Sequence, residues 1–177
     1  MATIQMNGLD EYLVKLSRLE QASKEEICGQ AIHQGAGIIA DAIREELKKL
    51  PTDESFGTQD HPAKGIKAVQ KNGLLKSLGI TGMREDNGYL NVKIGFDGYN
   101  KVKTARWPKG QPNQLVARSA ESGTTWLQKS PFVRVGVRKS RKQAVRTMKK
   151  SVDQSISELM NDSSKKALFT GKKSWEK

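Results

Sequence analysis

The sequence has few of the residues that metal sites and nucleophilic catalysis require. Its 177 residues include one cysteine and two histidines. Cys28 has no partner for an internal disulfide, which agrees with a reducing compartment. His33 follows Cys28 by five residues and His61 lies in another predicted element, so the ligand spacings of a zinc site are missing. A Cys–His pair formed only by the fold stays open, although no local pattern supports it.

Glycine-rich phosphate loops and paired catalytic carboxylates are also missing from the sequence. Gly35-Ala-Gly37 lies within helix-like sequence rather than after a strand, where a phosphate loop would stand. Acidic pairs such as Asp53-Glu54 are typical of solvated helix and loop surfaces. We therefore predict that the protein is not an enzyme and has no catalytic residue, no metal site and no cofactor.

Long apolar runs and a secretion signal are absent as well. No segment approaches the roughly 18 apolar residues of a membrane span. The first five residues carry no charged side chain, unlike the start of a secretory signal peptide. We therefore expect a protein that is made and used in the cytosol and has no membrane partner.

What the sequence has in excess is positive charge, and this charge is unevenly distributed. The net charge is +12, yet residues 1–62 hold 6 Lys/Arg against 11 Asp/Glu and residues 63–177 hold 25 against 8. A basic excess of this size indicates a polyanionic partner, which can be nucleic acid or an acidic protein surface. An acidic and a basic region on one chain also suit a head-to-tail interface. Solubility alone is the other explanation.

Hydrophobic spacing predicts two helices in the N-terminal third. The first carries leucines at spacings of three and four, namely Leu9, Leu13, Leu16 and Leu19. The second begins at the capping-box pattern Ser23-Lys-Glu-Glu26 and ends before Pro51. It contains three glycines, at Gly29, Gly35 and Gly37. Because glycine destabilises a helix interior, they imply either close packing against a neighbour or a break near His33.

After a polar loop over residues 51–72, the pattern changes to that of strands. Leu78–Met83 and Tyr89–Phe96 flank Asn87-Gly88, which supplies the positive-φ turn of a hairpin. Alternating apolar residues predict a half-buried second strand, and these residues are Leu90, Val92, Ile94 and Phe96. A second loop over residues 97–114 follows.

The last part of the chain is predicted to hold a short helix, a strand and a long helix. The short helix covers Leu115–Glu121 and is stopped by Gly123, and the strand is the alternating run Phe132–Val137. The long helix runs from a capping box at Ser140 to Met160. Its predicted buried stripe consists of Val145, Met148, Val152, Ile156 and Leu159.

A basic segment at the start of this last helix is the first candidate for binding. Seven of the thirteen residues over 138–150 are Lys or Arg. A ridge at spacings of 3, 4 and 4 is formed by Lys139, Lys142, Arg146 and Lys150. Cations in a first helical turn oppose the helix dipole, and a docked anion would offset this and meet free backbone N–H groups. The alternative is a solvated charged face.

Loop 97–114 and several aromatic residues extend the candidate surface. Trp107, Trp126 and Phe132 lie among basic residues, where aromatics can stack on bases or pack in protein interfaces; Phe132 also suits a core position. The further predicted contacts with a partner or DNA are Lys101, Lys103, Arg106 and Arg134.

Three short stretches, in order, resemble motifs of the tail-completion and head–tail joining family of long-tailed bacteriophages. The first stretch is similar to a Gly-x-Leu-x-x-Ser element, with Gly73, Leu75 and, one residue early, Ser77. The second is similar to Ala-x-x-x-Glu-x-Gly-Thr, with Glu121, Gly123 and Thr124. The third is similar to Pro-Phe-x-Arg, with Pro131, Phe132 and Arg134. The likeness covers residues 4–160, while residues 51–72, loop 97–114 and the C-terminal end depart from the family pattern.

The resemblance implies an α+β fold in which long N-terminal and C-terminal helices pack on a small, mostly antiparallel sheet. It implies one domain, which we place over residues 1–162. Independently of the resemblance, the polar and Lys-rich composition of residues 163–177 predicts a flexible basic arm. Gly123 would stop a helix, Glu121 would cap a helix or pair with an arginine such as Arg134, and Pro131 would fix the entry to a strand. These motif roles are structural.

The resemblance also implies a structural virion protein that completes the head-proximal end of the tail and joins it to the DNA-filled head. The expected partners are copies of itself in a ring, a hexamer being one option, the tail tube or tail terminator protein, head connector proteins and packaged DNA. Assembly would take place in the bacterial host cytoplasm. The alternatives are a sequence-nonspecific DNA-binding protein and, more distantly, a small enzyme of phage DNA metabolism.

Overall fold

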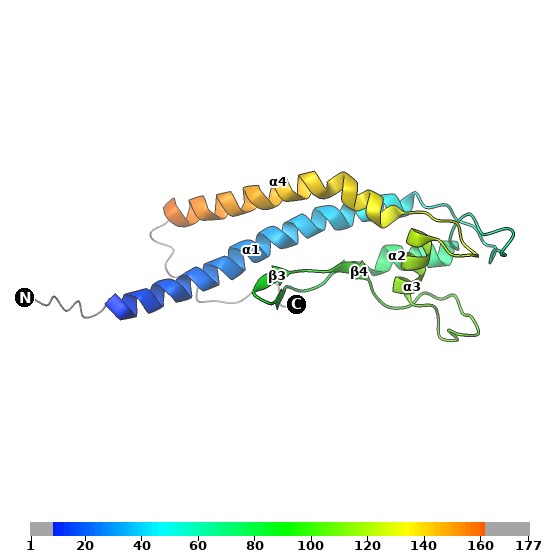
Figure 1. Cartoon of the computed structure of the whole chain (residues 1–177), viewed down its shortest axis with the longest axis horizontal. Helices are drawn as coiled ribbons and strands as arrows, with labels where there is room; N and C mark the ends of the chain where they lie inside the picture. The colour runs from blue at the N-terminus through cyan, green and yellow to red at the C-terminus, as the bar shows by residue number, and fades with distance from the viewer. Residues whose placement is uncertain (1–8, 162–177) are drawn as a thin grey trace, which may run out of the picture.

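Two long antiparallel helices, α1 (Leu9–Lys48) and α4 (Phe132–Asn161), run side by side along the molecule (Figure 1). The computed structural model describes residues 9–161, and side chains from residue 25 to residue 158. At 1.5 Å per residue, the 40 residues of α1 extend about 60 Å. Two short helices, α2 (Ala68–Ser77) and α3 (Asn113–Ser122), gather at the C-terminal end of α1.

A narrow ribbon of four short strands runs along α1 on the side away from α4 (Figure 1). β1 (Leu78–Ile80) pairs antiparallel with β4 (Ile94–Phe96), and β2 (Arg84–Asp86) pairs antiparallel with β3 (Tyr89–Asn91). The predicted α+β class with an antiparallel strand set is therefore confirmed.

The turn of this ribbon is the one that the sequence predicts. Asn87 and Gly88 have φ values of 53° and 80°, the left-handed conformation that a tight hairpin turn requires. Along the returning strand, Ile94 and Phe96 are half-buried while Lys93 and Gly95 are exposed. The alternation is confirmed at Ile94 and Phe96 but not at Asn91 and Val92, which are both half-buried. The strands expected over Leu78–Met83 and Tyr89–Phe96 are also interrupted, because the first ends at Ile80 and the second divides into β3 and β4.

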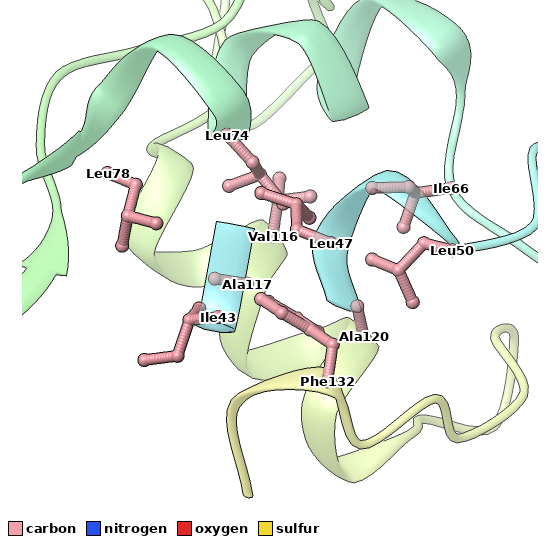
Figure 2. Packing of buried hydrophobic residues seen from close by; sticks show 10 residues of the cluster. All are labelled: Ile43, Leu47, Leu50, Ile66, Leu74, Leu78, Val116, Ala117, Ala120 and Phe132. Carbon is pink, nitrogen blue, oxygen red and sulfur yellow. The ribbon is translucent and has the colours of Figure 1, made fainter. Parts of the chain in front are cut away.

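The hydrophobic core lies where the ends of the four helices meet, as Figure 2 shows. Leu47 of α1 and Leu74 of α2 are completely buried at its centre. Phe132, the first residue of α4, is 3% exposed, and its ring meets that of Phe96 edge-on at 5.9 Å between centroids. The core therefore joins the strand ribbon and both long helices.

Small residues let α1 and α4 approach closely beyond this core. Gly136 lies against the backbone of Ile43, since a Cβ on Gly136 would be 2.9 Å from the Cα and N atoms of Ile43. Ser140 and Ala144 follow at intervals of one helical turn and are buried as well. We call this contact of Gly136, Ser140 and Ala144 with α1 the seam. The hydroxyl of Ser140 donates to the carbonyl of Gly136 over 2.8 Å, so this hydroxyl is paired although it is buried in the seam.

The structure corrects the two-helix prediction for the N-terminal third. α1 is continuous through the capping-box pattern at Ser23 and shows no break near His33. Close packing explains Gly35, because a Cβ there would be 2.6 Å from the Cγ of Met148 in α4. It does not explain Gly37, where no atom lies within 4 Å of an added Cβ, and Gly29 has only an ordinary contact of 3.5 Å with the Cε of Met83. The predicted loop over 51–72 is also too long, because α2 already begins at Ala68.

The predicted strand at Phe132–Val137 is wrong, because this segment is the first part of α4. Its apolar residues fit both periods: Phe132, Val133, Gly136 and Val137 also share one helical face, which packs on the core. The capping box at Ser140 is wrong for the same reason, since α4 has already begun.

The predicted buried stripe of this helix is only partly correct. Val145 and Ile156 are 53% and 45% exposed, whereas Met148 and Val152 are half-buried. The side chain of Leu159 lies outside the described residues, as do residues 1–8 and the predicted basic arm over 163–177. No helix within residues 9–161 is long and apolar enough to cross a membrane.

The close approach of α1 and α4 predicts opposite effects for two Gly→Ala substitutions. Gly136→Ala should lower the free energy of unfolding by about 1–3 kcal/mol, because the added methyl group meets the backbone of Ile43. Gly37→Ala, in α1 with no atom near its added Cβ, should raise it by about 0.5–1 kcal/mol. Denaturant unfolding followed by circular dichroism measures both, and a Gly136→Ala variant as stable as the wild type would contradict the seam.

Candidate functional site

The outward face of α4 carries a row of positive charge. α4 contains eight Lys/Arg residues, of which two pair with carboxylates of other elements. The remaining six are exposed and form no ion pair within the described part of the chain, and they are Arg138, Arg141, Lys142, Arg146, Lys149 and Lys150. From the first to the last, the row extends about 18 Å at the rise of an α-helix.

The seam with α1 determines which cations face outward. Because Gly136, Ser140 and Ala144 face α1, positions half a turn away face solvent, and these include Arg138 and Lys149. The sequence predicted a buried stripe through Val145, and the ridge predicted beside that stripe lies at the edge of the observed outward face. The predicted ridge therefore left out Arg138, Arg141 and Lys149, although all three belong to the basic segment 138–150.

Two of the predicted contact residues instead hold the fold together. The ammonium of Lys139 lies 2.8 Å from Oε1 of Glu46 and so joins α4 to α1. The hydrogen bond from Lys139, followed by that from Lys49, lowers the pKa of Glu46 below its ordinary value of 4.5. Arg134 is joined to α3 by its Nε, which lies 2.9 Å from Oε1 of Glu121.

The N-terminus of α4 is already capped and offers no site for a docked anion. Glu121 accepts the backbone N–H of Val133 over 2.8 Å and that of Arg134 over 3.1 Å. We expected free backbone N–H groups beside the basic ridge, at a helix start near Ser140. The helix instead starts earlier, and the N–H groups of its first turn, at Val133 and Arg134, already donate to the Glu121 carboxylate. The predicted capping and arginine-pairing roles of Glu121 are both confirmed.

The other motif residues also have structural positions. Gly123 ends α3 with φ 75°, as predicted, and its N–H donates to the carbonyl of Ser119 over 2.8 Å. Thr124 opens the next turn, where its hydroxyl accepts the N–H of Trp126 over 3.3 Å. Pro131 directly precedes α4, so it leads into a helix rather than into the predicted strand.

The first motif stabilises the packing of α2. A Cβ on Gly73 would lie 2.9 Å from Cβ of Asn100 and 3.0 Å from Oδ1 of Asn113, so only glycine fits without displacement. Leu75 is half-buried against the core, and the hydroxyl of Ser77 donates to the carbonyl of Leu74 over 3.3 Å.

The structure does not join loop 97–112 to the basic face of α4. Figure 1 places this loop beyond α3, on the side away from α4. Lys101, Lys103 and Arg106 are exposed, and Trp107 is half-buried with the Arg106 guanidinium 5.9 Å from its ring centroid. The predicted contact cations thus lie on two separate parts of the surface, α4 and loop 97–112.

The remaining aromatic candidates have different roles. Trp126 is 54% exposed in the turn before α4, and its carbonyl accepts the N–H of Ala63 over 2.9 Å, which joins two loops. Phe132 is a core residue and is not available for base stacking. His33 and His61 are exposed and Cys28 is half-buried. Within the described residues, no three His, Cys, Asp or Glu side chains gather as metal ligands.

The cap at the start of α4 predicts unequal effects for its two partners. Glu121→Ala should lower the free energy of unfolding by about 0.5–2 kcal/mol, because two backbone N–H groups lose their acceptor. Arg134→Gln keeps both of these bonds and should cost less than about 1 kcal/mol, as exposed ion pairs do. Hydrogen exchange at Val133 and Arg134 should accelerate in the first variant only; equal protection in both would contradict the cap.

The lowered pKa of Glu46 predicts an acid-dependent contribution to the contact between α1 and α4. Because the folded-state pKa lies below 4.5, this stabilisation is present above pH 4.5 and is lost as the pH falls through the folded-state value. The denaturation midpoint of the wild type should exceed that of Glu46→Gln at pH 7, and the difference should shrink towards pH 3. A difference that is independent of pH would show that the charge of Glu46 does not contribute.

Comparison with models of known protein families, with curated proteins and with solved structures gives no match to this chain. The resemblance to the head–tail joining family therefore stays a prediction that rests on the motif residues themselves. Their structural positions explain why a chain with this fold needs them.

Proposed function

We propose that the protein is a structural virion assembly protein of the phage neck, which completes the head-proximal end of the tail and joins it to the DNA-filled head. The observation that carries the proposal is the outward face of α4, whose six cations have no intrachain ion pair within the described residues. Such a face supports contact with a polyanionic surface, which at a neck is packaged DNA or an acidic protein ring.

The construction of this face suits a contact that does not read sequence. Its cations lie on a helix whose other side is packed against α1 by Gly136 and Ser140, so their spacing is fixed. Duplex DNA carries one charge per about 1.7 Å, so the row of about 18 Å can meet several phosphates. Phosphate contacts supply affinity and position without base specificity.

The neck proposal also implies which proteins the chain would contact. Copies of the chain would form a ring, with the tail tube or terminator protein on one side and the head connector on the other. The motif residues Gly73, Glu121 and Gly123 support the family assignment by holding α2, α3 and α4 together. Assembly into the virion would follow synthesis in the host cytoplasm.

A sequence-nonspecific DNA-binding protein is the second candidate, and the same unpaired cations favour it. The two candidates differ in the partner that supplies most of the free energy of binding, which is duplex DNA for the second candidate and other proteins for the first. A DNA-binding protein requires tight binding to free duplex, whereas a neck protein requires only weak DNA contact together with protein partners.

Electron microscopy of a lysate in which only this reading frame is disabled tests the neck assignment. We expect DNA-filled heads beside unattached or malformed tails, with joining restored by added wild-type protein. A variant in which four α4 cations are neutralised should fail to restore joining, and its substitutions are Arg138→Gln, Lys142→Gln, Arg146→Gln and Lys149→Gln. The matched control neutralises four cations of loop 97–112 and should restore joining, with Lys101→Gln, Lys103→Gln, Arg106→Gln and Lys109→Gln. Intact, infectious particles without the protein would defeat the neck proposal.

Duplex affinity measured against salt concentration separates the two candidates. The DNA-binding function predicts a steep decrease of log K with log salt, which flattens by roughly 0.9 for each phosphate contact that the α4 variant loses. The neck function predicts weak duplex binding at physiological salt for wild type and variant alike. Tight binding of free duplex by the wild type, together with normal particles in the disabled lysate, would establish the second candidate.

A further inference from the structure

The strand ribbon along α1 has an outgoing limb, which contains β1 and β2, and a returning limb, which contains β3 and β4 (Figure 1). Ile80 pairs with Ile94 across the ribbon. The next pair between the named strands joins Arg84 to Asn91. Three residues of the outgoing limb therefore lie opposite two of the returning limb, which is a β-bulge. Because a bulge makes an edge irregular, the returning limb is the better template for a further strand.

The outer edge of the returning limb has backbone groups without a partner. The N–H of Asp97 donates to the carbonyl of Ser77 over 3.1 Å. In the same way the N–H of Thr81 donates to the carbonyl of Lys93 over 2.8 Å, so the odd-numbered residues of this limb bond across the ribbon. The even-numbered residues consequently point to the outer edge, where no backbone hydrogen bond reaches them within the described part of the chain. These residues are Leu90, Val92, Ile94 and Phe96.

The free edge has a definite length. It begins after the Asn87-Gly88 turn. It ends at Gly98, whose carbonyl accepts the N–H of Asn113 over 3.0 Å, so that residues 111–113 occupy the edge from there on. A strand that pairs with the free edge must therefore end or turn away before it reaches Gly98.

The outer face of the ribbon has two features that a single chain does not explain. Gly79 and Gly95 lie opposite each other, and a Cβ added to either would have no atom within 4 Å among the described residues. Neither has the positive φ that favours glycine, although glycine weakens a strand interior. On the same face, Tyr89 is 77% exposed. A bare strand surface of this kind is typical of a place where another chain approaches closely.

We propose that two copies of the chain pair through the outer edges of their returning limbs, about a two-fold axis at Val92. This register places Leu90 opposite the partner's Ile94, so the apolar sides of the two limbs continue each other. It places Tyr89 opposite the partner's Gly95, where an aromatic ring covers bare strand backbone. The contact is self-complementary, as a two-fold interface requires.

The length of the free edge selects this register. With the axis at Val92, the partner's Asn87-Gly88 turn lies opposite Phe96 and Asp97 and so stops just before residues 111–113. An axis closer to Gly98 would push the partner's turn into that segment.

The proposed pairing also suits the charges and the size of the ribbon. Lys93 lies opposite the partner's Asn91, so no two like charges face each other directly. Two ribbons that are each two strands wide become one sheet four strands wide, and a sheet of three or more strands is far more stable than a lone pair. The inference concerns the free chain and does not depend on the neck assignment, because the ribbon lies on the side of α1 away from α4.

Analytical ultracentrifugation of the full chain tests the proposal with matched proline variants. Ile94→Pro removes an N–H from the free edge, whereas Ile80→Pro removes one from the opposite edge, directly across the ribbon. The wild type should be a dimer, and Ile94→Pro should raise its dissociation constant by about five- to a hundredfold, because two symmetry-related hydrogen bonds are lost. Ile80→Pro should dissociate as the wild type does. A wild type that is monomeric at every concentration, or equal weakening by both prolines, would overturn the proposal.

Exposed tyrosines give a second pair of variants that leaves the backbone unchanged. Tyr89→Ala should weaken the dimer by about two- to thirtyfold, since each copy loses one cross-strand aromatic contact. Tyr99→Ala, at a tyrosine that is 67% exposed beyond the free edge, should have no effect. A dimer that Tyr89→Ala leaves unchanged would show that the two copies meet elsewhere.

Disulfide trapping checks the register. In a Cys28→Ser background, Asn91→Cys together with Lys93→Cys should oxidise to a covalent dimer, because the two positions lie opposite each other across the axis. The matched pair on the outgoing limb, Gly79→Cys with Thr81→Cys, should give no covalent dimer. Covalent dimer from the second pair only would assign the contact to the other edge and refute the proposal. Each of these failures leaves the neck test intact, because that test changes α4 and not the ribbon.

Discussion

The close approach of α1 and α4 at Gly136 is the constraint on which the rest of the structure depends. With no side chain there, the backbone of α4 rests directly on that of Ile43, and Ser140 and Ala144 continue the contact. This contact fixes the rotation of α4 about its own axis. It consequently determines that Val133, Gly136 and Val137 face inward and that Arg138 and Lys149 face solvent. The position of the basic face is thus a result of packing.

The same constraint separates the charges that stabilise the fold from those available to a partner. Lys139 and Arg134 lie beside Glu46 and Glu121 and pair with them, which links α4 to α1 and α3. The cations on the outer side have no such neighbour among the described residues. A hollow beside Asn113 is built from α2, α3 and the segment after β4. The protein therefore presents an outer row of α4 cations and, apart from it, this open hollow between α2 and the segment that follows β4.

Features determined by neighbours in the sequence were predicted correctly. The Asn87-Gly88 turn and the stop of α3 at Gly123 each depend on short-range backbone geometry. The capping role of Glu121, whose partners lie 12 and 13 residues further on, was instead implied by the family resemblance. The alternating strand at Ile94 and Phe96 follows from the period of the pleat. The long helices and the α+β class were also predicted. The division of α1 at Ser23 failed, because a capping pattern has no effect where the helix continues through it.

By itself, the sequence determined the fold class, the hairpin, the excess of positive charge and the segment that carries most of it. Only the tertiary structure decided that Phe132–Val137 is helical, because an alternating apolar run fits a strand and a helix face equally until a packing partner is present. It also decided which cations are free and that loop 97–112 lies apart from α4. The hollow at Asn113 could not be predicted, because its walls come from segments about 15 to 40 residues apart that only the folded core brings together. Local rules specify the turns and helix stops, whereas the helical state of Phe132–Val137 and the faces that elements present to partners depend on contacts between elements.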